Sequence, residues 1–212
     1  MTAGGTGKTP FVEYLVAHAL KQNKKVAVVS RGYKRTSKDM VVVSDGESML
    51  VDQRSAGDEP FQIARKFPKA IVIVDTKRSR AAAAAIDRYA ADLIILDDGF
   101  QHRALSRDLD IVMIKGTGLL GVMPLLPAGL RREAMSGLRR AQMVAFSGGD
   151  VRIEVSDEVR KYSSAPIIAV APKAIALRGV FDDSELELAA LHGKSCMAFC
   201  GIGYPDGFRK LL

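Results

Sequence analysis

The sequence predicts an α/β protein in which helices flank a parallel sheet. Three observations support this fold class. Short apolar runs alternate with helical patterns, a glycine-rich segment directly precedes the first helical pattern, and one apolar run ends in two carboxylates. At 212 residues the chain is long enough for one such domain and a small second unit.

Strands are expected where β-branched and apolar residues form nearly continuous runs, as in strands that are covered on both faces. These runs are 25–30, 70–74, 93–96 and 111–114, and a last strand of the core is expected at 142–146. Between them, apolar residues recur at helical spacing in 10–22, 58–66, 79–91 and 150–162. The alternation of the two patterns favours a parallel sheet.

The last part of the chain is expected to form connections and the start of a further unit. The runs 166–171 and 174–180 are typical of a connecting pair of strands, and 195–199 is expected to begin a strand–turn–helix unit. We therefore expect a core domain at 1–165, linker strands at 166–194 and the beginning of a C-terminal subdomain at 195–212.

The composition restricts the class of protein. The net charge of +7 suits an anionic partner, but charge alone does not choose among nucleotides, nucleic acid and an acidic lipid surface. Cys196 and Cys200 have no second pair, which excludes a disulfide framework and a four-cysteine zinc site and fits a reducing cytosol. The sequence has no run of about 20 apolar residues and no signal pattern, so any membrane contact is expected to be peripheral.

A glycine-rich segment opens the sequence and predicts a phosphate-binding loop. Gly4, Gly5 and Gly7 allow backbone N–H groups to turn inward around phosphate oxygens, and the following helix directs its positive end at them. Thr2 stands where the general pattern has its first glycine. A solvent-exposed glycine-rich terminus is the alternative interpretation.

Lys8 and Thr9 complete the phosphate-loop pattern. The Lys8 ammonium would neutralise charge on the β- and γ-phosphates, and the Thr9 hydroxyl would bind Mg²⁺. The expected fold is therefore P-loop NTPase-like. A non-kinase ATPase switch with the same double glycine would carry a lysine where this chain has Ala3, which argues against that class.

Two carboxylates, Asp97 and Asp98, follow the apolar run 93–96. Parallel sheets bind ligands at the C-terminal ends of their strands, and a phosphate loop needs an acid there to hold Mg²⁺. Adjacent side chains point to opposite sides of a strand, so one carboxylate can face the metal while the other organises the loop or the acceptor. A plain Asp-Gly turn is the alternative. His102 follows closely, and both a structural and a catalytic role stay open for it.

The segment 97–102 (DDGFQH), followed by 105–112 (LSRDLDIV), resembles the tetraacyldisaccharide 4′-kinase family, the lipid A pathway kinases of Gram-negative bacteria. Further motifs agree with this family in order and spacing, so the resemblance extends over nearly the whole chain. These motifs are 2–10 (TAGGTGKTP), 31–33 (RGY), 57–60 (GDEP), 125–129 (LLPAG) and 198–203 (AFCGIG).

The resemblance implies ATP- and Mg²⁺-dependent phosphorylation of the 4′-hydroxyl of a lipid-linked glucosamine disaccharide, a lipid A precursor in lipopolysaccharide biosynthesis. It implies a peripheral location at the cytoplasmic face of the bacterial inner membrane. The partners would be this precursor and the membrane, with no nucleic acid. The apolar loop 119–130, closed by Arg131 and Arg132, is a candidate membrane contact, although core packing explains its apolar half equally well.

The resemblance also assigns roles to individual residues. The ATP-binding residues would be Thr2, Ala3, Gly4, Gly5, Thr6, Gly7, Lys8 and Thr9, the metal ligands Thr9 and Asp97, and the catalytic residues Asp75 and Asp98. From their positions at strand ends, Arg31, Gln101 and His102 are the expected substrate-binding residues, and a solvated basic turn is the alternative for Arg31. Asp75 ends the run 70–74 and matches the acid proposed to deprotonate the sugar hydroxyl. A carboxylate that caps the next helix or pairs with Arg78 is the alternative.

Compared with the family pattern, the chain is expected to be truncated at both ends. The family has a membrane-associated N-terminal helix and a strand before the phosphate loop. It also continues past the position of Leu212 into an Asp-His-His segment that contributes to catalysis. A catalytically inactive fragment of the kinase is therefore an alternative to an active enzyme.

Overall fold

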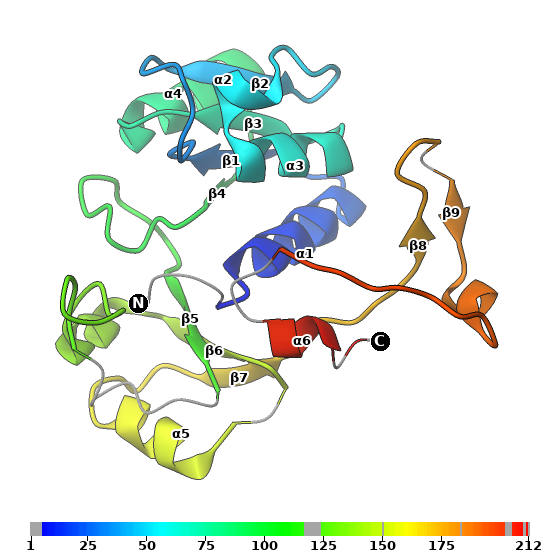
Figure 1. Ribbon diagram of the computed structural model, residues 1–212. Coiled ribbons are helices and arrows are strands. Elements are labelled where there is room, and N and C mark those ends of the chain that lie inside the picture. Colours follow the sequence, from blue (N-terminus) through cyan, green and yellow to red (C-terminus); the bar gives the residue numbers. More distant parts are fainter. Residues whose placement is uncertain are drawn as a thin grey trace. The chain divides into compact units, whose positions relative to one another are not determined.

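The computed structural model describes residues 6–116, 124–149, 151–182, 184–201, 205–209 and 211. The chain divides into two units, one of residues 7–110 and one of residues 111–212 together with 1–6. Both contain helices and strands, which confirms the α/β fold class (Figure 1). The domain boundaries expected after residues 165 and 194 fall within the second unit and stay predictions. None of the helices in the described ranges combines the length and the apolar character needed to cross a membrane.

The first unit contains a four-stranded sheet in the order β2-β3-β1-β4. Its strands are β1 (Val26–Ser30), β2 (Val41–Asp45), β3 (Ile71–Val74) and β4 (Leu93–Leu96). β3 and β4 both pair with β1 in parallel, as the apolar runs predict. β2, which no sequence pattern indicated, pairs with β3 in the antiparallel direction and has an irregular register between Val42 and Ser44.

Helices cover both faces of this sheet because its strands are apolar on both sides. They are α1 (Lys8–Lys21), α2 (Gln53–Ala56), α3 (Asp58–Lys66) and α4 (Arg78–Tyr89). Val26 and Val28 of β1 belong to a core that includes residues of α1 and α3, whereas Ala27 and Val29 belong to a core that includes residues of α4. Successive side chains of one strand therefore alternate between two buried layers. Three of the four helices expected in the chain, those at 10–22, 58–66 and 79–91, are confirmed as α1, α3 and α4.

A buried carboxylate joins α1 to α3. Glu13 of α1 is 8% exposed, and it accepts hydrogen bonds from Gln62 Nε2 (3.0 Å) and Lys66 Nζ (2.6 Å) of α3. Each carboxylate oxygen thus has a partner, which offsets the cost of burying the charge. This contact fixes the spacing of the two helices.

The second unit contains a three-stranded parallel sheet in the order β5-β6-β7. Its strands are β5 (Ile111–Lys115), β6 (Met143–Ser147) and β7 (Ile167–Val170), and they are accompanied by η1 (Met135–Arg140) and α5 (Ile153–Arg160). Val144 and Phe146 of the middle strand are fully buried. The strands expected at 111–114 and 142–146 and the helix expected within 150–162 are confirmed, whereas the 3₁₀ helix η1 was not expected.

The remaining described elements are short: β8 (Leu177–Arg178), β9 (Glu185–Leu186), η2 (Leu188–Leu191) and α6 (Pro205–Arg209). The runs 166–171 and 174–180 each contain a strand, β7 and β8, but the two do not pair with each other, because β7 joins β6 and β8 pairs with β9. The strand expected at 195–199 is wrong: these residues are exposed and pair with no described strand. An apolar run becomes a strand only where a neighbouring backbone satisfies its N–H and C=O groups.

Candidate functional site

The candidate site begins at the N-terminus of α1. Gly7 directly precedes this helix with φ 74°, a left-handed conformation that glycine adopts without steric cost. The first turn of α1 contains no acidic residue, so its positive end is available to an anion. Lys8 and Thr9 are the first two residues of the helix, and Thr6 is buried. Thr2, Ala3, Gly4 and Gly5 lie outside the described residues.

Asp97 directly follows β4 and is 3% exposed. Its backbone N–H donates to the Val29 carbonyl oxygen (3.0 Å), which continues the parallel pairing of β4 with β1. Its side chain is hydrogen-bonded to Ser30, the last residue of β1. The strand pairing therefore holds this carboxylate at the C-terminal edge of the sheet, where parallel sheets bind ligands.

The surroundings of Asp97 oppose its ionisation. Its pKa is raised to about 6, first by burial and then by the negative charges of Glu59 and Asp98. The Lys8 ammonium acts in the opposite direction, which places the phosphate-loop lysine close to this carboxylate. The lysine and the strand-end acid that the sequence paired are thus brought together.

This arrangement fits Mg²⁺. No group of three or more His, Cys, Asp or Glu side chains within the described ranges is arranged to hold a metal ion by itself. Mg²⁺ commonly binds one or two carboxylates and completes its shell with water and phosphate oxygens, so Asp97 with Thr9 is a sufficient protein share. A divalent cation would also favour the charged form of Asp97, which the protein alone disfavours.

The chain turns sharply after Asp97. Asp98 is exposed and has φ 51°, in the left-handed region that residues with a Cβ rarely adopt. A Cβ on the next residue, Gly99, would lie 2.5 Å from Leu96 Cβ, so only glycine fits there. Strained backbone of this kind is concentrated at functional sites, which is consistent with a role for Asp98.

Asp75 follows β3 and is fully buried. It accepts hydrogen bonds from Arg80 Nε (2.6 Å), from Arg80 Nη2 (3.0 Å) and from the Lys77 backbone N–H (2.9 Å). Burial alone would raise the pKa of Asp75, but these donors outweigh it and hold the pKa below its usual value. A carboxylate with a lowered pKa and occupied oxygens is a weak base, so the geometry favours an anchoring role, and the assignment of Asp75 as the base stays a prediction.

The residues expected to bind substrate lie after neighbouring strands. Arg31 directly follows β1 and is exposed, whereas Gln101 and His102 lie in the loop after β4. Arg78 Nη1 lies 3.3 Å from His102 Nδ1. The structure therefore brings His102 to a cation at the start of α4.

Arg107 fixes the loop that carries His102. It forms a two-pronged ion pair with Asp110 (2.6 and 3.1 Å), and both side chains are 14% exposed. Its Nη1 also donates to the carbonyl oxygens of His102 (2.6 Å) and Leu105 (2.7 Å). This set of bonds orders the loop before any ligand binds.

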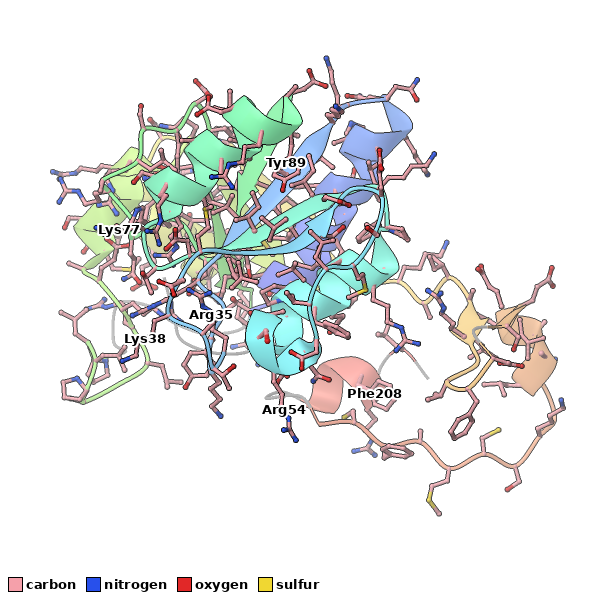
Figure 2. The ribbon with its side chains drawn as sticks, turned by 90° about the horizontal axis from the view of Figure 1, so that it is seen from above. Arg35, Lys38, Arg54, Lys77, Tyr89 and Phe208 are labelled. Atoms are coloured by element: carbon pink, nitrogen blue, oxygen red, sulfur yellow. The ribbon has the colours of Figure 1, made fainter. Side chains whose placement is uncertain are left out.

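A pocket of about 290 Å³ lies between the loop after β1 and the junction of α2 and α3. Its lining includes Tyr33, Lys34, Arg54 and Asp58, and the Lys34 ammonium lies 5.5 Å from the centre of the Tyr33 ring. Rings and cations of this kind suit a polar group such as a sugar. The loop is held in part by Arg35, which donates to the carbonyl oxygens of Asp39 (2.5 Å) and Lys38 (3.3 Å); Figure 2 labels Arg35, Lys38 and Arg54.

Two residues near the acid pair were not identified from the sequence. The negative charge of Glu59 raises the pKa of Asp97. In the sequence, Glu59 is only part of the motif 57–60, which supports the family resemblance. The sequence suggests Arg78 only as a possible ion-pair partner of Asp75, and in the structure Arg80 forms that ion pair. The effects of Asp97 and Asp98 on the pKa of Arg78 place it near the acid pair. No local pattern predicts either proximity.

Comparisons with known proteins identify the family of the chain. The family model described as tetraacyldisaccharide-1-P 4′-kinase (LpxK) matches residues 1–212. Proteins named tetraacyldisaccharide 4′-kinase from Syntrophotalea carbinolica and Halothermothrix orenii are 38% and 37% identical, and each alignment covers 100% of this chain. The alignments cover 58% and 59% of those two relatives, so the chain spans somewhat more than half of their length.

The fold is also similar to a solved structure. The crystal structure of the "apo" form of LpxK from Aquifex aeolicus in complex with ATP matches with a TM-score of 0.80 and 33% identity. The match covers 100% of this chain and 64% of that one. This likeness confirms the P-loop type of fold. Since the family model extends over the whole sequence, the chain belongs to the tetraacyldisaccharide-1-P 4′-kinase family.

Proposed function

We propose that this protein is an ATP-dependent kinase that phosphorylates the 4′-hydroxyl of a tetraacyldisaccharide 1-phosphate. The observation that carries the proposal is the placement of Lys8, at the start of α1, beside the buried carboxylate of Asp97. A helix N-terminus with a lysine binds phosphates, and an acid at the end of the neighbouring strand binds their cation. Family membership supplies the identity of the acceptor.

The nucleotide would bind at residues 2–9, with Lys8 at the β- and γ-phosphates. Thr9 and Asp97 would hold Mg²⁺, and the charge of Glu59 adds to the negative potential around Asp97 that favours a cation. Bound there, Mg²⁺ supplies positive charge to the phosphate oxygens. Asp97 remains ionised in that state because the cation offsets the neighbouring carboxylates.

The acceptor would lie beside Asp98, with Arg31, Gln101 and His102 around it. The exposure of Asp98 and its position next to Asp97 support contact with an acceptor hydroxyl. Asp75 is retained as the proposed base, although its proton-accepting capacity is reduced by Arg80. A base role would require the acceptor to displace part of this ion pair.

We also propose peripheral attachment to the cytoplasmic face of the inner membrane, since the acceptor carries four acyl chains. The net charge of +7 would support binding to anionic lipid, as would Arg131 and Arg132. Residues 119–123 of the expected contact loop 119–130 lie outside the described residues. Co-sedimentation with anionic vesicles tests the attachment, and binding that is equal for neutral vesicles would contradict the electrostatic part.

A calorimetric titration with Mg–ATP tests the proposed nucleotide site. Lys8→Ala should abolish binding, whereas Lys21→Ala, which removes the same charge from the exposed other end of α1, should bind as the unchanged protein does. Equal binding by the Lys8 variant would remove the main support for a kinase.

Phosphoryl transfer to tetraacyldisaccharide 1-phosphate, followed by mass spectrometry of the lipid, tests the reaction. Asp75→Asn should keep nucleotide binding and lose transfer if Asp75 is the base. Normal turnover by this variant would show that the base lies elsewhere. ATP hydrolysis without any phosphorylated lipid would instead indicate an ATPase.

A further inference from the structure

We propose that Arg78 and His102 together bind a phosphate group at the C-terminal edge of the first unit's sheet. This inference deepens the proposed function and rests on it. It adds Arg78 to the site and gives His102 a defined protonation state and partner.

The topology brings three basic side chains to one edge. Arg31 follows β1, Arg78 is the first residue of α4 after β3, and His102 lies in the loop after β4. The strands β3, β1 and β4 are adjacent and parallel, so their C-terminal ends share one edge of the sheet. Positive side chains from three separate loops thus converge where the acid pair lies.

The hydrogen bond between Arg78 and His102 determines the tautomer of the ring. A guanidinium only donates, so His102 Nδ1, 3.3 Å from Arg78 Nη1, must accept. The proton of the neutral ring is then on Nε2. Burial lowers the pKa of His102, and the charges of Arg78 and Arg107 lower it further, which keeps the ring neutral at pH 7.

This pair contains two N–H groups that lack acceptors. Arg78 Nε and His102 Nε2 are both buried and have no hydrogen-bond partner within the described part of the chain. A buried donor without an acceptor costs about 1–3 kcal/mol, so two of them in one pair indicate a ligand that supplies oxygen atoms.

The charge around the pair favours an anion. Two nearby arginines already have carboxylate partners, Arg80 with Asp75 and Arg107 with Asp110, whereas the hydrogen bond of Arg78 goes to a neutral ring. Burial lowers the pKa of Arg78, the Arg31 charge lowers it further, and Asp98 and Asp97 raise it. An anion between Arg78 and Arg31 would relieve their repulsion.

The backbone that carries the ring is also held in place before a ligand arrives. Arg107 Nη1 donates to the His102 carbonyl oxygen (2.6 Å), and the His102 backbone N–H donates to the Gly99 carbonyl oxygen (2.9 Å). Donors that need no rearrangement bind an oxyanion most strongly. The group bound is a phosphate, and its source is either the γ-phosphate of ATP or the phosphate carried by the sugar acceptor.

Binding measurements on three variants separate these two sources. We compare the unchanged protein, Arg78→Gln and the control Arg88→Gln, which removes one charge from the exposed far end of α4. Each is titrated with Mg–ATP, Mg–ADP and glucosamine 1-phosphate. If the site binds the γ-phosphate, Arg78→Gln should weaken the binding of Mg–ATP about 10- to 100-fold and leave the binding of Mg–ADP unchanged. If the site binds the acceptor phosphate, only the binding of glucosamine 1-phosphate should weaken by this factor. Unchanged binding of all three ligands would overturn the proposal.

A second measurement does not depend on nucleotide binding or on substitution. The chain has three histidines, so ¹⁵N-histidine labelling gives a simple spectrum in which His102→Gln identifies the signal of His102. At pH 7.5, His102 should show protonated Nε2 and unprotonated Nδ1, and inorganic phosphate should shift Nε2. The opposite tautomer, or no shift with phosphate, would contradict the inference. If the unchanged protein shows the shift but binds no Mg–ATP, the proposed kinase function fails while this site stands.

Discussion

The first unit and residues 171–201 differ in how they bury apolar side chains. In the first unit every residue of β1 and β3 is buried, and helices cover both faces of the sheet. Among the described residues of 171–201 none is buried, and Phe181 and Phe199 are about as exposed as in an extended chain. The two regions have similar apolar character in sequence and opposite environments in structure.

This difference shows where the candidate site obtains its rigidity. Lys8, Asp75 and Asp97 all adjoin elements whose side chains form the two cores of the first unit. The hairpin of β8 and β9 pairs two residues on each strand, too few to be stable alone. A binding site whose side chains must be held within a fraction of an ångström requires a packed core such as that of the first unit.

The contrast between the first unit and residues 171–201 would be refuted most directly if a core isoleucine and an exposed isoleucine contributed equally to the free energy of unfolding. Ile63→Ala removes a fully buried side chain and should lower the free energy of unfolding by about 2–5 kcal/mol. Ile175→Ala is the matched control, since Ile175 is 83% exposed, and it should change the value by less than about 0.5 kcal/mol. Urea unfolding followed by circular dichroism measures both, and similar losses would refute the contrast.

The burial of Asp97 is expected to lower the free energy of unfolding at neutral pH. Its folded pKa of about 6 lies above the unfolded value of about 3.9, so the folded state loses stability as pH rises from about 4 to 6. Asp97→Asn should therefore unfold with a free energy about 3 kcal/mol higher at pH 7 and show little difference at pH 3.5. Unfolding at both pH values without Mg²⁺ measures this. A less stable variant at pH 7 would contradict the burial argument.

Asp75 should behave in the opposite way. Its folded pKa is lowered, so its contribution is present above the usual aspartate pKa and is lost as pH falls through the folded value. Asp75→Asn should cost about 1–2 kcal/mol at pH 7, a modest figure because the Arg80 side chain is 50% exposed. Asp87→Asn on the exposed side of α4 is the control. An equal loss at pH 7 and pH 2 would show that the ion pair is not the cause.

The smallest effect is expected in residues 171–201. Phe199→Ser exchanges a side chain that is 89% exposed, and it should change the free energy of unfolding by less than about 0.5 kcal/mol. Amides of 195–201 should exchange with deuterium near the unprotected rate, whereas those of β1 should exchange only on global unfolding. Protection of 195–201 comparable to that of β1 would show that this segment is covered in solution.

Local patterns predicted the elements that bury their side chains on a regular period. The apolar run of β1 and the helical spacing of α3 identified both elements because period and burial coincide there. β2 was missed because its pairing with β3 is irregular and it lies at the edge. The run 195–199 has strand-like composition, but strand formation depends on a partner that a local pattern does not specify.

The site was predictable where motif and topology coincide. Lys8 and Asp97 were expected to meet because a phosphate loop and a parallel strand end bind one ligand. Arg78 and Glu59 approach the acids through loops from other strands and helices, which no spacing in the sequence reveals. The choice of Arg80 as partner of Asp75 likewise depends on the direction in which α4 leaves the sheet.

The carboxylate of Glu13 has a mechanical consequence. It connects α1, which starts at Lys8, to α3, which contains Glu59 in its first turn. A displacement of the phosphate loop that moved α1 as a whole would carry Glu59 with it through Gln62 and Lys66. A substitution at Glu13 would remove these two bonds between α1 and α3, and so could alter both the proposed phosphate site and the acidic charge near Asp97 from a position that contacts neither.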